Sequence, residues 1–183
     1  MQKRAGCVVM ALCGLMGMGL VGCGAADTAQ DAENFEIQAA VTSDLPAEFD
    51  ITQFGKLLGK PYIKVRGRAG GTRAQVGSNE ILAYVFVTDA GVYAITSHSF
   101  KDSVEQRAEG DTTYHGHMVT LDASNCVSSI NDDSFPYLTT RRVFLLGTKA
   151  KQVDAVLTAR LTVTSAGVCV DKVYDQMAVP ATP

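Results

Sequence analysis

Residues 155–164 alternate between apolar and mostly polar side chains with a period of two. This alternation limits the fold more than any other feature of the chain. In an extended strand successive side chains point to opposite faces, so a period of two lets the strand bury one face. Ala155, Leu157 and Leu161 fall on one side, whereas Thr158 and Arg160 fall on the other. The pattern predicts a β-strand that covers an apolar core.

Residues 80–88 are apolar on both faces, which is typical of a strand in the middle of a sheet. Five further segments bounded by turn residues also predict strands: 62–66, 92–98, 115–122, 141–147 and 168–174. We therefore expect residues 48–183 to form a single mainly β domain. The expected architecture is an antiparallel β-sandwich or a small β-barrel of about seven strands, because alternation does not encode strand order.

A short N-terminal helix is expected before the first strand. Asp50 is a suitable N-cap, and Phe54, Leu57 and Leu58 follow it at helical spacing. Gly59 would end this helix, so its predicted span is residues 51–58.

The N-terminus has the features of an export signal. Lys3 and Arg4 precede a run without charged residues, which ends in the sequence Leu20-Val21-Gly22-Cys23. This order resembles the signal peptide and lipobox of bacterial lipoproteins. The resemblance implies that residues 1–22 are removed and that Cys23 becomes a lipidated N-terminus. The alternative is an uncleaved membrane anchor, which the glycines of the run and the absence of a following basic cluster disfavour.

The resemblance also implies a location in the cell envelope. Gly24 stands where an Asp often signals retention at the inner membrane, which favours the outer membrane in a cell that has one. Residues 23–47 contain acidic side chains but no Lys or Arg, and they are expected to form a flexible tether.

Two cysteines remain in the predicted domain, Cys126 and Cys169. An even pair in an exported chain predicts a disulfide, and closing a loop of this length stabilises the fold by about 4 kcal/mol. Two buried free thiols are the alternative. The pair is not arranged as Cys-x-x-Cys, so redox catalysis is not expected.

The histidines are weak candidates for a metal site. His115 and His117 share a face if residues 115–122 form a strand, so both imidazoles could reach one metal ion, and His98 could add a third ligand. Because His-x-His also arises without any function, we expect solvated strand histidines and no cofactor.

No catalytic constellation is evident elsewhere. Ser97 and His98 are neighbours on a predicted strand, so their side chains point to opposite faces and do not form a nucleophile–base pair. Asp122, Asp132 and Asp133 lie in or near expected loops without the spacing of a calcium-binding loop, and we interpret them as surface turns. An enzyme is therefore not favoured.

A basic stretch is the main candidate for a partner-binding surface. Its members are Lys56, Lys60, Lys64, Arg66, Arg68 and Arg73, with no acidic residue between them. Such a stretch could contact an anionic component of the envelope or a protein partner. A solvated sheet edge is the simpler interpretation. Acidic and basic residues balance from Glu48 onward, so nucleic-acid binding is not expected.

These observations rank three functions. The first is a lipid-anchored binding or structural module of the envelope. The second is a small metal-binding protein or enzyme that uses His115 and His117. The third is a barrel that carries an apolar ligand.

Overall fold

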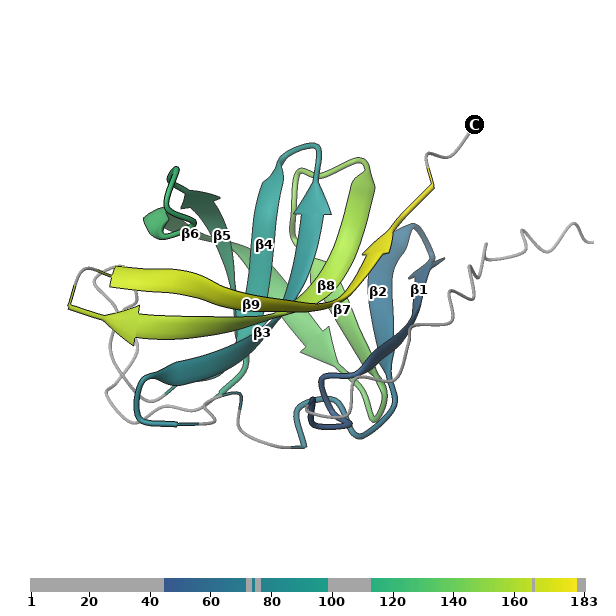
Figure 1. Ribbon diagram of the computed structural model, residues 1–183. Coiled ribbons are helices and arrows are strands. Elements are labelled where there is room, and N and C mark those ends of the chain that lie inside the picture. The colour runs from purple at the N-terminus through teal and green to yellow at the C-terminus, as the bar shows by residue number, and fades with distance from the viewer. Residues whose placement is uncertain (1–44, 72–73, 75–76, 99–112, 166, 181–183) are drawn as a thin grey trace, which may run out of the picture. The chain divides into compact units, whose positions relative to one another are not determined.

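Nine β-strands form the described part of the chain (Figure 1). The computed structural model describes residues 45–71, 74, 77–98, 113–165 and 167–180. The strands are β1 (Ile51–Leu57), β2 (Lys60–Val65), β3 (Glu80–Thr88), β4 (Gly91–Thr96), β5 (His115–Leu121), β6 (Val127–Leu138), β7 (Arg142–Leu146), β8 (Val153–Thr164) and β9 (Gly167–Ala178). Among these residues there is no helix, and hence none that could span a membrane.

The strands are all antiparallel, in the order β1-β2-β7-β6-β5-β4-β3-β8-β9. Strand β6 belongs to two sheets, because its first half pairs with β5 and its second half pairs with β7. One sheet therefore contains β1, β2, β7 and β6, and the other contains β6, β5, β4, β3, β8 and β9. Strands β1 and β9 end the order, so the described strands do not form a closed barrel, and the arrangement is consistent with a β-sandwich.

The main core lies between the two sheets. Ile63 and Val143 face it from the four-stranded sheet, whereas Leu82, Tyr84 and Phe86 face it from β3. The ring of Phe49 stacks on that of Tyr84 with 4.8 Å between centroids. Burial of these side chains provides the main favourable contribution to folding.

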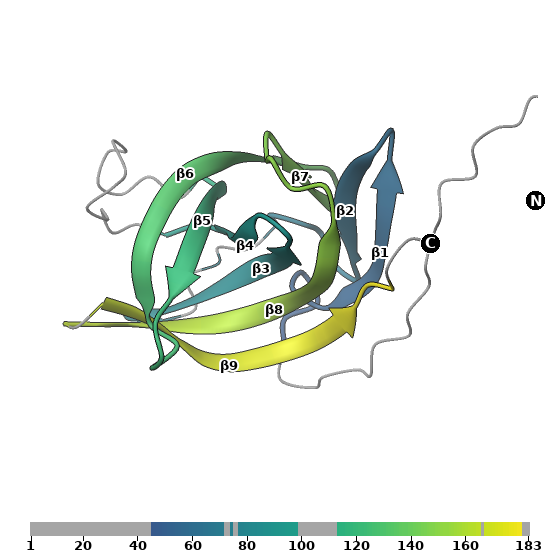
Figure 2. The ribbon, with the colours of Figure 1, turned by 90° about the horizontal axis from the view of Figure 1, so that it is seen from above.

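A second apolar cluster lies on the other face of β3. It contains Ile81, Ala83 and Val85, together with Leu157 and Leu161 of β8. The predicted central strand is confirmed, since β3 is buried on both faces between β4 and β8. Figure 2 shows that the six-stranded sheet is curled.

The predicted Cys126–Cys169 disulfide is present. It joins the turn before β6 to β9, where the two cysteines also form an isolated antiparallel bridge. The bond therefore holds the two ends of the curled sheet against each other.

The predicted helix over residues 51–58 is wrong, because this segment is strand β1 and its turn. The register shifts between Ile51 and Gln53, so one extra residue separates Ile51 from Phe54. This bulge places both side chains in the main core at a spacing of three residues. A bulged strand can therefore imitate the apolar spacing of a helix.

Strand β6 was not expected from the sequence. It includes Asp132 and Asp133, which were predicted to lie in a loop. In the described residues each half of β6 pairs with one neighbouring strand, so Pro136, which has no amide hydrogen, is accommodated opposite Leu145. Together with β1, this strand accounts for the difference between the predicted seven strands and the nine observed.

Candidate functional site

The three histidines of the chain meet at one end of the β4–β5 ladder. His115 and His117 lie on β5, opposite Thr96 and Ala94 of β4. His98 follows β4 by two residues. The antiparallel register therefore brings His98 to the end of the ladder where His115 lies, although 17 positions separate the two residues.

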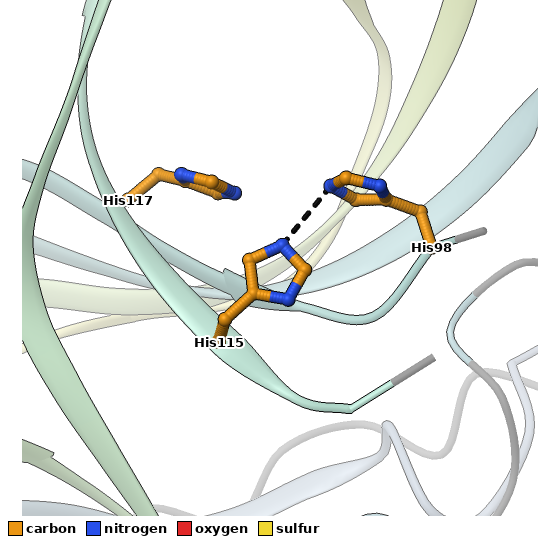
Figure 3. Close-up of side chains that lie close together, drawn as sticks. All are labelled: His98, His115 and His117. Atoms are coloured by element: carbon orange, nitrogen blue, oxygen red, sulfur yellow. Dashed lines mark hydrogen bonds between the residues drawn. The ribbon is translucent and has the colours of Figure 1, made fainter. Parts of the chain in front are cut away.

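The imidazole rings point toward one another (Figure 3). The Nε2 atoms of His98 and His115 are 3.0 Å apart. One ring nitrogen from each of the three histidines lies within 4.8 Å of the others. Tetrahedral zinc, with Zn–N bonds of about 2.0–2.1 Å, separates its nitrogen ligands by about 3.3 Å. The 3.0 Å between the Nε2 atoms of His98 and His115 is close to that separation.

The backbone fixes the tautomer of His115. Its Nδ1 lies 2.8 Å from the carbonyl oxygen of Thr113, and a carbonyl can only accept, so Nδ1 carries the hydrogen. In the neutral ring Nε2 then has the lone pair and accepts from His98 Nε2. A carbonyl that holds the outer nitrogen is the usual support of a metal-binding histidine, because it leaves the inner nitrogen free to coordinate.

The expectation of solvated histidines is wrong. His98, His115 and His117 are only 4, 3 and 5% exposed. A signal for this was present in the sequence, because His115 and His117 are in phase with Val119 and Leu121 along β5. These two apolar residues line the curled side of the sheet, so the histidines face inward with them.

A small pocket of about 50 Å³ adjoins the cluster. His98 and His117 line it together with Thr96, Ile130 and Leu161. A larger hollow of about 260 Å³ lies next to it on the curled side of the sheet. Both spaces were beyond what sequence reasoning identified, because they depend on how far the sheet curls.

No protein family, curated protein or solved structure matches this chain. The chemistry of the site therefore rests on its own residues. Three neutral imidazoles suit zinc or copper, and three ligands leave a fourth position for a water or an added ligand.

Ser97 does not act as the nucleophile of a serine–histidine pair. Its Oγ lies in the core and accepts the backbone N–H of Ala74 at 3.0 Å. Tyr114 packs beside it, and burial raises the pKa of this phenol to about 12. Ser97 and Tyr114, which directly precede His98 and His115, therefore have a structural role in the core.

The basic residues do not form one uniform surface. Arg66 forms an ion pair with the buried Asp50. The hydrogen bond that its guanidinium donates to this carboxylate raises the pKa of the guanidinium. Lys64 faces Arg142 across the β2–β7 ladder, whereas Lys56 and Lys60 flank the tip of the β1–β2 hairpin. Arg68 is exposed after β2, and Arg73 lies outside the described residues.

Leu57 and Leu58 occupy the tip of the same hairpin and are 44 and 94% exposed. Both were predicted to lie on one face of a helix. The structure instead places these two leucines between Lys56 and Lys60 at the tip of the β1–β2 hairpin.

Other predicted positions have simple roles or remain untested. The carboxylate of Asp122 accepts the backbone N–H groups of Ser124 and Cys126, which makes it part of a surface turn. Cys23, the signal peptide and most of the tether lie outside the described residues. Lipidation and the boundary at residue 48 therefore stay predictions.

Proposed function

We propose that this protein is a metal-binding module of the cell envelope, in which His98, His115 and His117 hold a zinc or copper ion. The observation that carries the proposal is the convergence of the three histidines at buried positions, with ring nitrogens within 4.8 Å of one another. A single metal ion could be bound by all three rings at once, since imidazole nitrogen is a usual ligand of zinc and copper.

The backbone around the cluster supports this proposal. The Thr113 carbonyl orients His115 before any ion binds, so little conformational freedom is lost on binding. The disulfide removes Cys126 and Cys169 as competing ligands. Among the described residues, the site therefore offers nitrogen ligands alone.

Metal binding can be tested on the mature chain, residues 24–183, without its lipid. Zinc titration should give one ion per chain. Substituting any one histidine, as in His117→Gln, should weaken binding at least 100-fold, because two ligands remain. Thr120→Ala is the matched control, since Thr120 lies on β5 but is exposed. Unchanged zinc affinity in all three histidine variants would contradict the proposal.

The envelope location rests on the resemblance of residues 1–23 to a lipoprotein signal. We propose that Cys23 carries the lipid and that the domain is held at the membrane, with no enzymatic activity required of it. A labelled fatty acid should join the wild-type chain and not a Cys23→Ala chain. Equal retention of both chains at the membrane would refute the lipid anchor.

A second function is favoured by the hairpin tip. Two exposed leucines between two lysines suit the surface of an anionic membrane, where apolar side chains enter the interface and ammonium groups meet phosphates. The unlipidated chain should bind vesicles that contain phosphatidylglycerol more tightly than vesicles of phosphatidylcholine alone. Leu58→Ser with Lys60→Ser should remove that difference, whereas Arg68→Ser should retain it.

A further inference from the structure

The large hollow beside the histidines has an apolar wall. Its volume is about 260 Å³, and all the residues that line it are apolar except Asn125. Its wall includes Val85, Val92, Val119, Leu157, Leu161 and Val170. Such a surface binds hydrocarbon and offers almost nothing to a polar molecule.

The hollow leads to the histidines. It shares Ala94, Val119 and Leu161 with the small pocket that His98 and His117 line. Along β5 the inward-facing residues change from His115 and His117 to Val119 and Leu121, with about 7 Å between alternate residues. A molecule lying along this strand would therefore have a metal-binding group at one end and an apolar wall at the other.

The charge of the proposed metal site indicates which chemical group of the ligand binds the ion. Among the described residues, the cluster consists of three imidazoles and no carboxylate, so an anionic fourth ligand would compensate the two positive charges of the ion. A carboxylate oxygen is a usual zinc ligand. The cavity volume lies between the about 150 Å³ that holds benzene and the range of about 300–1,000 Å³ for drug-sized molecules.

We propose that this hollow binds a small aliphatic carboxylic acid, with the carboxylate on the metal ion and the hydrocarbon chain against the curled sheet. The inference rests on the proposed metal site. It adds the class of ligand and the direction in which that ligand lies.

Octanoate and acetate separate the two parts of the proposal. Both acids offer the same carboxylate, but only octanoate has a chain that reaches the hollow. Calorimetry on the zinc-loaded mature chain, residues 24–183, should show octanoate binding at least 100-fold more tightly than acetate. The metal-free chain should bind octanoate at least 10-fold more weakly than the zinc-loaded chain.

Variants of the wall show where the chain lies. Val87→Phe narrows the hollow and should reduce the preference for octanoate over acetate to less than 10-fold, with zinc affinity unchanged. If that variant does not fold, Val173→Trp at the more exposed rim serves the same purpose, because Val173 is 45% exposed. Lys149→Ala is an exposed control that lies outside the residues lining the hollow.

The outcomes distinguish the two proposals. Zinc binding with equal affinities for octanoate and acetate would overturn the ligand and leave the metal site intact. Equal octanoate binding with and without zinc would overturn the coordination of the carboxylate. Failure of zinc itself to bind would refute the proposed function on which this inference rests.

Discussion

Among single residues, Tyr114 makes the stability of the fold depend on pH in the alkaline range. Burial raises the pKa of its phenol from 10.0 to about 12. Between these values the unfolded chain releases the phenolic proton while the folded chain keeps it. The folded state therefore binds more protons, and its free energy of unfolding must fall as the pH rises from 10 to 12.

Tyr114→Phe should reduce this alkaline loss of stability. The loss should become shallower and not vanish, because burial also raises the pKa of the neighbouring Tyr84. Urea unfolding at several values between pH 9 and 12 measures the slope for each protein, and a series at pH 7 gives the baseline effect of the substitution. Parallel pH profiles for the two proteins would show that Tyr114 is not the titrating group.

Gly67 sits where a side chain would meet backbone. A Cβ atom at this position would lie 2.8 Å from the carbonyl carbon of Ala47 and from the nitrogen of Glu48. The amide of Gly67 also donates to the Ala47 carbonyl at 2.6 Å, so the two segments are held together at this point.

Gly67→Ala should lower the free energy of unfolding by about 1–3 kcal/mol, because backbone cannot move aside as easily as a side chain. Gly77→Ala is the matched control, since a Cβ there would be no closer than 3.7 Å to its neighbours. Chemical denaturation of both variants provides the comparison. Equal stabilities would mean that the Gly67 contact relaxes without cost.

At the level of elements, the β1–β2 hairpin has an unfavourable residue in its turn. Leu58 and Gly59 form a two-residue connection, and both have positive φ, at 51° and 73°. Asn and Gly are favoured at such positions, whereas leucine is destabilised there by about 1–2 kcal/mol. The residue at the tip is thus not the one that gives the most stable turn.

Leu58→Asn should therefore stabilise the protein by about 1 kcal/mol and weaken its binding to anionic vesicles. Thermal unfolding and vesicle sedimentation measure the two effects. Leu57→Asn removes a neighbouring leucine without a gain in stability, because Leu57 is not among the residues with positive φ. A Leu58→Asn protein with unchanged vesicle binding would show that the tip has no membrane role.

The disulfide joins the residue before β6 to β9, and these are the two end strands of the curled sheet. Cys126 and Cys169 are separated by 43 residues, and opening a loop of this size should cost about 4 kcal/mol. The double substitution Cys126→Ser, Cys169→Ser should lower the free energy of unfolding by about this amount in denaturant titrations. It should also weaken any binding in the hollow, whose wall both β6 and β9 help to form.

For the whole molecule, the sequence correctly predicted a mainly β fold and seven of the strands, but it did not predict β1 and β6. Residues 80–88 match β3 because a short apolar run bounded by turn residues is a local signal, and residues 155–164 lie within β8 because strict alternation is another. The segment at 51–58 was misassigned because a bulge changes the spacing of buried residues. Strand β6 was missed because its polar residues and Pro136 carry no strand signal of their own.

In the candidate site too, local properties could be predicted from the sequence and properties of the tertiary fold could not. The sequence showed that His115 and His117 share a strand face, which is a local property. Their burial, and the approach of His98, depend on strand register and on the curl of the sheet. The phase of His115 and His117 with Val119 and Leu121 indicates which way they face, but the spacing of residues along the chain does not encode the approach of His98 or the depth of burial.

The most direct test of the account is the coordination of zinc in the intact protein. X-ray absorption at the zinc edge of the loaded mature chain should show three imidazole nitrogens at about 2.0–2.1 Å, with one further light ligand. His98→Gln, His115→Gln and His117→Gln should each lose the three-imidazole signature. A shell made mainly of oxygen or sulfur ligands, or a spectrum unaffected by these substitutions, would contradict the three-histidine site.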